Sequence, residues 1–276
     1  MHNNYLMILF PTAKLNLGLQ IIAKRTDGYH NLQTVFYQFP LRDILEIVED
    51  SSLGDGNYEF KSTGLPIPRG ENLCVRAYKL LNEKWSLPGV RIYLHKVIPM
   101  GAGLGGGSSD AAYTLRLLNT LFRLNLSHKE LREFALRLGS DCPLFIENKV
   151  QYAEGRGEIL TKINLNLNGM YLLIVYPKIH ISTAQAFANI KPVDSHSCKS
   201  IVDQAVANWK TNLVNDFEAS IFPNYPELKS IKDKIYALGA DYAAMSGSGS
   251  TIFGLFTDKI PSTEWPEDYF VWQTCL

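Results

Sequence analysis

A glycine-rich run, Gly101–Ser109, is the feature that most constrains what this chain can fold into. Residues 90–94 before it alternate between apolar and polar side chains, as in a half-buried strand, and residues 110–122 after it carry apolar side chains at helical spacing. Glycine has no Cβ, so the backbone N–H groups of such a loop can approach a ligand closely. A helix N-terminus adds free N–H groups and a positive dipole end. The run therefore predicts a phosphate-binding loop, with a flexible connector or a tight strand-to-helix turn as the alternative.

Two well-known phosphate motifs fit this loop only in part. Gly101, Gly103 and Gly106 match the dinucleotide pattern G-x-G-x-x-G, but residues 122–128 contain no Asp or Glu to hold a ribose, and regular βαβ alternation is missing. The P-loop pattern fails because Gly107 stands at the lysine position. The H-R-D and D-F-G sequences of protein kinases are also absent. Charge on a bound phosphate must then be balanced by residues elsewhere in the chain.

Length and charge narrow the class of protein. The chain has 276 residues, which favours two domains or one large one, and 46% of them are hydrophobic, enough for a sizeable core rather than disorder. Lys plus Arg equals Asp plus Glu at 27 each, so the formal net charge is zero. Proteins dedicated to nucleic acid or to anionic membranes need a basic excess. We therefore expect neither kind of partner, although one local basic pocket for a small anion remains compatible with this balance.

Cysteine usage and hydropathy favour a cytoplasmic protein. The cysteines stand at positions 74, 142, 198 and 275, too far apart for a zinc knuckle or a redox pair, and we expect reduced thiols. The longest strongly apolar stretch, Met170–Tyr176, is too short to span a bilayer. The apolar segment Tyr5–Phe10 has no basic residues before it and is followed by Pro11, so we interpret it as a first strand rather than a signal peptide.

Strands and helices are expected without regular alternation, which predicts an α+β protein. Strands are expected at residues 5–10, 15–22, 32–39, 44–48, 90–94, 171–176 and 252–256, and helices from residue 71 to 84 and within 110–122, 131–138 and 228–238. We place a boundary near residue 155. The predicted domains are 1–155, for nucleotide binding and catalysis, and 156–276, on the substrate side.

Several motifs, taken in order, resemble one kinase family. The run Pro99–Ser109 resembles the central motif of the GHMP kinases, the family of galactokinase and of homoserine, mevalonate and phosphomevalonate kinases. Five further stretches resemble its other blocks, namely Pro11–Leu17, Asp27–His30, Gly139–Pro143, Gly155–Glu158 and Ser246–Ser250. The resemblance runs from about residue 11 to residue 256. Cys142 and Leu144 depart from the usual apolar residues there, and the last twenty residues match nothing we can name.

The resemblance implies a fold and an activity. The fold would be two α+β domains with the active site in the cleft between them. The activity would be ATP-dependent and Mg²⁺-requiring phosphorylation of an alcohol group, and the motifs are most similar to those of members that act on a cytidylyl sugar alcohol in isoprenoid precursor synthesis. We expect a monomer or weak homodimer. The alternatives are a homoserine-type or mevalonate-type kinase, or a non-catalytic nucleotide-binding or RNA-binding module.

Two residues are the candidates for the chemical step. Asp141 lies in a loop between Gly139 and Pro143, where a helix N-cap is the simpler interpretation, and the resemblance implies that it takes the proton from the substrate hydroxyl. Lys14 lies in an apolar strand, where an unpaired ammonium would be expensive to bury. The alternative for Lys14 is an edge-strand lysine that points to solvent. Period-two geometry puts Asn16 on the same face as Lys14, within reach of a substrate.

The remaining candidates bind nucleotide and substrate. For ATP they are Asn72, Leu73, Lys96, Pro99, Met100, Gly101, Ala102, Gly103, Leu104, Gly105, Gly106, Gly107, Ser108 and Ser109, with Ser108 also a candidate Mg²⁺ ligand. For the substrate they are Asn16, Tyr29, His30, Thr183, Phe187 and Gly247. We expect Tyr29 and Phe187 to sandwich a cytosine whose edge His30 reads. The alternative is that both aromatic rings belong to the core, as most do.

Overall fold

The computed structural model describes residues 7–68, 70, 72–188, 190, 192 and 197–276, so Tyr5 and Leu6 of the expected first strand lie outside the described residues. The chain forms two compact units that are each discontinuous in sequence. The first contains the segment before Lys14, Pro40–Met100 and Gly105–Asn148, and the second contains Lys14–Phe39, Gly101–Leu104 and Lys149–Leu276. The division therefore differs from the predicted one, 1–155 and 156–276, because the early strands pair with strands that follow Asn148.

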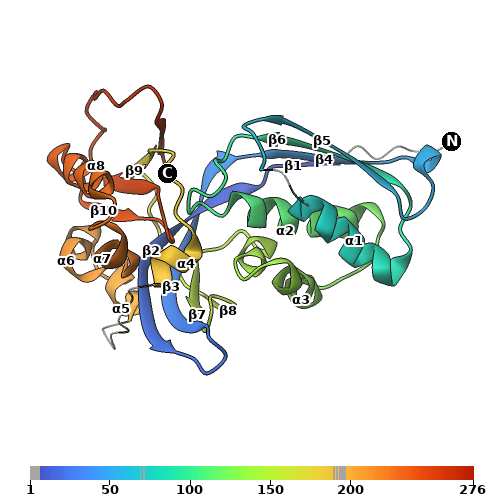
Figure 1. Cartoon of the computed structure of the whole chain (residues 1–276), viewed down its shortest axis with the longest axis horizontal. Helices are drawn as coiled ribbons and strands as arrows, with labels where there is room; N and C mark the ends of the chain where they lie inside the picture. Colours follow the sequence, from blue (N-terminus) through green and yellow to red (C-terminus); the bar gives the residue numbers. More distant parts are fainter. Residues whose placement is uncertain (1–6, 69, 71, 189, 191, 193–196) are drawn as a thin grey trace. The chain divides into compact units, whose positions relative to one another are not determined.

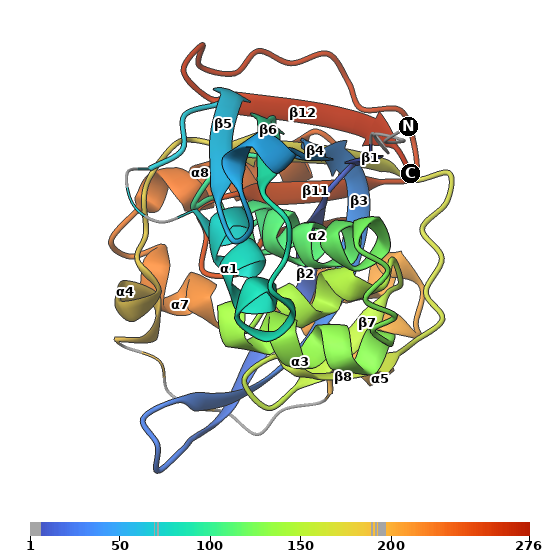
Figure 2. The ribbon, with the colours of Figure 1, turned by 90° about the vertical axis from the view of Figure 1, so that its right-hand side faces the viewer.

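The first unit is a four-stranded sheet with helices on one face. Its sheet order is β1-β4-β6-β5, antiparallel except for the parallel pair β5 and β6. Helices α1, α2 and α3 lie together against one face of this sheet (Figure 1), and the same helices face the viewer in Figure 2. The elements are β1 (Met7–Leu9), β4 (Ile44–Glu49), η1 (Ser51–Leu53), β5 (Tyr58–Gly64), α1 (Leu73–Trp85), β6 (Val90–Lys96), α2 (Gly106–Leu121), α3 (His128–Leu138) and η2 (Cys142–Ile146).

Local sequence explains where these helices begin and end. The side chain of Asn72 accepts a hydrogen bond from Cys74 N and caps α1. Ser127 and Glu130 form a capping box at the start of α3, which ends at Gly139 as its sequence predicts. Helix α2 differs, because its N-cap is Gly105 in the left-handed region and no side chain caps it. Its first-turn N–H groups therefore have no capping side chain to bond.

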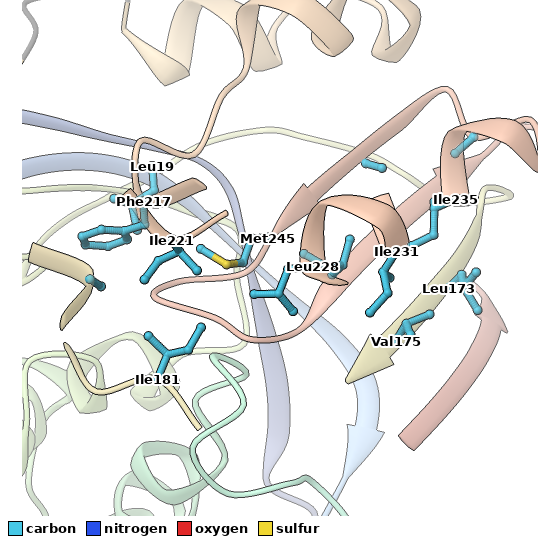
Figure 3. Packing of buried hydrophobic residues seen from close by; sticks show 14 of the residues in the cluster. Leu19, Leu173, Val175, Ile181, Phe217, Ile221, Leu228, Ile231, Ile235 and Met245 are labelled. Atoms are coloured by element: carbon cyan, nitrogen blue, oxygen red, sulfur yellow. The ribbon is translucent and has the colours of Figure 1, made fainter. Parts of the chain in front are cut away.

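The second unit has two four-stranded sheets, ordered β2-β3-β7-β8 and β10-β11-β9-β12. A hydrophobic core of this unit lies between helix α8 and the second sheet, where Leu228, Ile231 and Ile235 pack with Leu173 and Val175 (Figure 3). The elements are β2 (Thr12–Lys24), β3 (His30–Arg42), β7 (Gln151–Glu154), β8 (Ile159–Lys162), β9 (Tyr171–Tyr176), α4 (Thr183–Phe187), α5 (Cys198–Val202), η3 (Val206–Asn208), α6 (Trp209–Asn212), α7 (Phe217–Ile221), α8 (Pro226–Ala237), β10 (Tyr242–Met245), β11 (Ile252–Phe256) and β12 (Phe270–Cys275).

The predicted α+β class is confirmed, and the long strands and helices fall where periodicity places them. The strands β5, β7, β8, β10 and β12 and the short helices α4 to α7 were not expected. Helices of four or five residues have too few turns to show a period. Among the described residues, no helix is both long and apolar enough to cross a membrane.

Candidate active site

Lys14 is buried in β2 with its ammonium held by neutral oxygens. Its Nζ donates to Asn16 Oδ1 at 2.5 Å and to the carbonyl oxygen of Gly103 at 2.9 Å. The same Nζ lies 5.5 Å from the centre of the Phe36 ring. The expected shared face of Lys14 and Asn16 is confirmed by this contact.

Two glycine loops of the second unit meet at Lys14. Ser246 Oγ donates to the carbonyl oxygen of Gly103 at 3.0 Å, so one carbonyl receives both Ser246 and Lys14. Gly103 has φ +80°, and a Cβ there would lie 2.1 Å from Ser246 O. A Cβ on Gly247 would lie 3.3 Å from Lys14 Nζ and 3.4 Å from Asn16 Oδ1. The predicted Gly247 thus borders the ammonium directly, where only a residue without a side chain leaves it open.

Asn215 holds the second glycine loop in place, and the sequence analysis missed it. Its Nδ2 donates to the carbonyl oxygens of Met245 at 2.7 Å and Gly247 at 2.8 Å, while its Oδ1 accepts from Phe217 N. Glu218 Oε1 accepts from Met245 N. The polar residues at the start of α7 could have indicated a helix start. The hydrogen-bond partners of Asn215 are some thirty residues away, so they leave no local pattern in the sequence.

In the first unit, the beginning of α2 offers polar groups with few protein partners. The Ser109 Oγ is buried and has no hydrogen-bond partner among the described residues. Ser108 forms a hydrogen bond with the thiol of Cys142, although burial still raises the pKa of that thiol to about 12. Uncapped N–H groups and small side chains at a helix N-terminus suit an anion. Mg²⁺ is bound by one or two protein oxygens together with phosphates and waters, so these hydroxyls fit such an ion.

Lys96 is fully buried between two carboxylates of the first unit. Its fully buried Nζ lies 2.5 Å from Asp43 Oδ2 and 2.8 Å from Asp110 Oδ2. Burial disfavours the ammonium, but the two carboxylates more than offset this and raise the pKa of Lys96. Burial also raises the pKa of Asp110 to about 8. A Cβ on Gly106 would lie 3.2 Å from Lys96 Nζ, so Lys96 supports the first turn of α2 from beneath. The predicted nucleotide contact of Lys96 stays a prediction.

Other predicted nucleotide residues come together beside α2. A Cβ built on Gly107 would lie 3.4 Å from Met100 Cε and 3.8 Å from Leu73 Cδ1, so these three residues form one apolar patch. Asn72 precedes Leu73 and is occupied as the cap of α1. Pro99 is buried. A flat apolar ring could rest on the Leu73–Met100 patch, whereas Asn72 contributes through its backbone position.

Asp141 occupies the N-cap position of η2, but its carboxylate makes no capping hydrogen bond. The simpler interpretation of this residue, a capping aspartate, is therefore not what the structure shows. Asp141 is partly exposed, and the next residue, Cys142, is the one that contacts Ser108 at the start of α2. The Asp141 loop and the first turn of α2 are thus neighbours within the first unit.

The predicted substrate aromatics are arranged differently from the expected sandwich. The His30 and Phe187 rings stack, with centroids 4.7 Å apart and planes 18° apart, and Phe187 also meets Phe217 edge-on at 4.8 Å. Tyr29 is 54% exposed, and the Arg156 guanidinium lies 4.9 Å above its ring. Burial, and then Lys24, lower the pKa of His30 and favour its neutral form. His30 therefore covers the Phe187 face that the sandwich assigns to a base.

Thr183 opens the short helix α4, next to the capping box of Ser182 and Gln185. Its side chain is exposed. The helix presents Thr183 at its first turn and Phe187 at its last, so these two predicted substrate residues belong to one element.

Comparisons with known proteins agree on one family. A sequence model described as the GHMP kinases N terminal domain matches residues 72–148, and one described as the GHMP kinases C terminal domain matches residues 200–263. A Bacteroides fragilis protein named 4-diphosphocytidyl-2-C-methyl-D-erythritol kinase is 51% identical over 98% of this chain and 100% of its own length. A protein of the same name from Bacteroides thetaiotaomicron is 48% identical over 96% and 98%.

One solved structure extends the similarity to three dimensions. The crystal structure of a 4-(cytidine 5'-diphospho)-2C-methyl-D-erythritol kinase superposes with a TM-score of 0.78 at 35% identity, covering 90% of each chain. The similarity therefore includes both units rather than one motif.

Proposed function

Because this chain belongs to the GHMP kinase family, it is a small-molecule kinase, and we propose that it transfers the γ-phosphate of ATP to the 2-hydroxyl of 4-diphosphocytidyl-2-C-methyl-D-erythritol. The names of full-length relatives support this substrate. The observation that carries the proposal is the buried Lys14 ammonium, which donates to Asn16 Oδ1 and to the Gly103 carbonyl oxygen and is bordered by Gly247. A fixed cation beside an open glycine backbone suits a transferring phosphoryl group.

Phosphoryl transfer needs positioning and charge stabilisation more than covalent chemistry. In the proposed mechanism, Lys14 stabilises negative charge on the transferring group, and Asp141 accepts the proton of the attacking hydroxyl. Lys14 belongs to the second unit and Asp141 to the first, and each role is supported by the residue's own surroundings. Asp141 lies beside Cys142, which contacts Ser108 at the start of α2, so its loop adjoins the proposed phosphate site.

The nucleotide side of the proposal uses the start of α2. The N–H groups after Gly105 and the backbone of Gly106 and Gly107 would hold ATP phosphates, and Leu73 with Met100 would contact the adenine. Ser108 or Ser109 would hold Mg²⁺, which when bound neutralises charge on the phosphate oxygens. Gly101–Leu104 contributes on the second unit through the carbonyl that fixes Lys14.

The substrate side uses the aromatic residues of the second unit. We propose that Phe187 and Tyr29 stack on the cytosine while His30 leaves the Phe187 ring and reads the base edge. Thr183 would contact the linking diphosphate, and Asn16 and Gly247 would contact the sugar alcohol. The neutral form of His30 suits this role, since it has both a donor and an acceptor nitrogen.

The deciding experiment measures ADP release by the pure protein with ATP, Mg²⁺ and each candidate alcohol. We expect turnover with 4-diphosphocytidyl-2-C-methyl-D-erythritol and none with homoserine or mevalonate. Turnover of homoserine or mevalonate would instead indicate a homoserine-type or mevalonate-type kinase. Binding of nucleotide or RNA without turnover would indicate the non-catalytic alternative. We further propose a cytoplasmic monomer or weak homodimer without a nucleic-acid or membrane partner.

A further inference from the structure

Thr34 is a fully buried residue of β3 whose hydroxyl makes two hydrogen bonds. Its Oγ1 donates to the carbonyl oxygen of Gly18 at 2.5 Å and accepts from Asn16 Nδ2 at 3.1 Å. A hydroxyl has one hydrogen and two lone pairs. Since the hydrogen goes to Gly18, only lone pairs face Asn16. Thr34 therefore offers Asn16 an acceptor and no donor.

This polarity fixes the orientation of the Asn16 amide. With Nδ2 directed at Thr34, Oδ1 is directed at Lys14 Nζ, 2.5 Å away. The flipped amide would place Nδ2 against an ammonium, donor against donor, and Oδ1 against an oxygen that has no hydrogen left. All three side chains are buried, so water is not at hand to relieve such a mismatch.

The Gly18 carbonyl is itself held by the backbone. Gly18 has φ +67°, and a Cβ there would lie 2.6 Å from Leu213 Cδ1 and 2.9 Å from Cys198 Sγ. The conformation therefore requires glycine, and it directs the carbonyl at Thr34. The Gly18 backbone therefore fixes the direction of the hydrogen bonds that run through Thr34 and Asn16 to Lys14. It does so without a bound ligand.

We propose that Thr34 is a positioning residue for phosphoryl transfer, which acts through the Asn16 amide to hold the Lys14 ammonium in its working direction. Thr34 is fully buried and does not touch the reacting atoms. The inference rests on the proposed function, in which Lys14 stabilises the transferring group, and it adds a residue to which neither the sequence analysis nor the proposed mechanism assigns a role.

Two substitutions separate positioning from packing. Thr34→Val keeps the branched shape and removes the hydroxyl, whereas Thr34→Ser keeps the hydroxyl and leaves a methyl-sized void. We expect Thr34→Val to lower kcat about 5- to 30-fold, the scale of one misdirected buried hydrogen bond, with KM for ATP within about twofold. We expect Thr34→Ser to keep kcat within about threefold of the parent even where its Tm is lower. Parent-like kcat in Thr34→Val, or an equal loss in both variants, would overturn the proposal.

A second comparison tests whether the effect passes through Asn16. In an Asn16→Ala background, Thr34→Val should change kcat by less than about twofold, because the amide it orients is gone. A full additional loss there would show that Thr34 acts by another route. If Thr34→Val does not fold, Thr34→Ala removes the same hydroxyl and must show the same dependence on Asn16.

An NMR measurement keeps this inference separate from the proposed function. The side-chain amide protons of Asn16 should exchange slowly in the parent and in Thr34→Ser, and faster in Thr34→Val. A parent that releases no ADP with any candidate alcohol would refute the proposed function while these exchange rates still decide the arrangement. Equal exchange rates in all three proteins would refute the positioning role.

Discussion

Replacing Lys96 by methionine is expected to destabilise the protein strongly. The lysine side chain is fully buried, and the side chains of its partners Asp43 and Asp110 are 0% and 3% exposed. Methionine fills much of the same volume but removes the cation. Asp43 would keep the N–H groups of Val97 and Ile98, whereas Asp110 already has one oxygen, Oδ1, without a partner among the described residues. Two buried carboxyl groups would then share no compensating charge.

The expected size of the effect follows from that burial. Removing one partner of a buried ion pair typically costs about 3–5 kcal/mol. At about 2–4 °C per kcal/mol for a chain of this length, Tm should fall by about 6–20 °C in a calorimetric or fluorescence melt. Lys61→Met is the matched control, because the Lys61 side chain is 59% exposed beside Glu59 and an exposed ion pair contributes little to stability.

A second substitution and the pH dependence of Tm test why Lys96→Met is less stable. Adding Asp110→Asn to Lys96→Met removes a buried titratable carboxyl group and should restore part of the lost Tm. The pKa of Asp110 in the folded protein is about 8, above its ordinary value of 3.8. Proton binding to Asp110 therefore contributes fully to the free energy of unfolding below about pH 4, and this contribution is lost as the pH rises through 8. The Tm of Lys96→Met should therefore fall more steeply between pH 5 and 8 than that of the double variant. A Lys96→Met melt within 2 °C of the parent, or no rescue, would refute this reasoning.

Three further predictions concern the site. Lys14→Ala and Asp141→Asn should each lower kcat about 10²-fold or more with little change in Tm, measured by ADP release, and near-normal turnover in a folded variant would remove that residue from the mechanism. Gly103→Ala should lower both Tm and activity, because its Cβ would lie 2.1 Å from Ser246 O. Gly169→Ala is the control for backbone strain alone, since Gly169 has φ +88° and open space around a Cβ. Equal Tm values for the two variants would disprove the clash. Phe187→Ala should raise KM for the cytidylyl substrate about 5- to 150-fold and leave KM for ATP unchanged. Phe222→Ala, from the same core cluster, should lower Tm only, and an unchanged substrate KM in Phe187→Ala would make Phe187 a core residue.

The sequence was most informative where one local pattern carries the feature. The glycine run between a strand and a helix predicted α2 and its uncapped start, because the glycines and the apolar period lie side by side in the chain. Period-two alternation likewise predicted that Lys14 and Asn16 share a face. The same rule places Lys96 on the buried face of β6 with Leu94, so its burial could have been predicted. Its partner Asp43 could not, since that residue is distant in the chain.

Contacts between distant segments account for the other differences. Asn215 bonds to carbonyl oxygens some thirty residues further on, and no periodicity reports such a pair. The stacking of His30 on Phe187 depends on how α4 packs beside β3, which single residues do not encode. The order of pairing that brings β3 beside β7 is also non-local. The boundary predicted at residue 155 is a single cut in the sequence, whereas each unit is built from several separate segments of the chain.

Because each unit consists of separate chain segments, the order of synthesis and the choice of fragment ends both affect whether the second unit can fold. The sheet of β2, β3, β7 and β8 joins strands from the start and the middle of the chain, so the ribosome releases β2 and β3 long before their partner β7 exists. Until then the edge of β3 is unpaired, a state that invites aggregation, and the second unit completes only when synthesis is nearly finished. Neither unit can be excised by a single cleavage or expressed as one uninterrupted fragment: a piece consisting of residues 156–276 lacks β2, β3 and β7, three of the strands on which it folds. Shuffling halves between relatives will therefore succeed only when residues 14–39 travel with the C-terminal half.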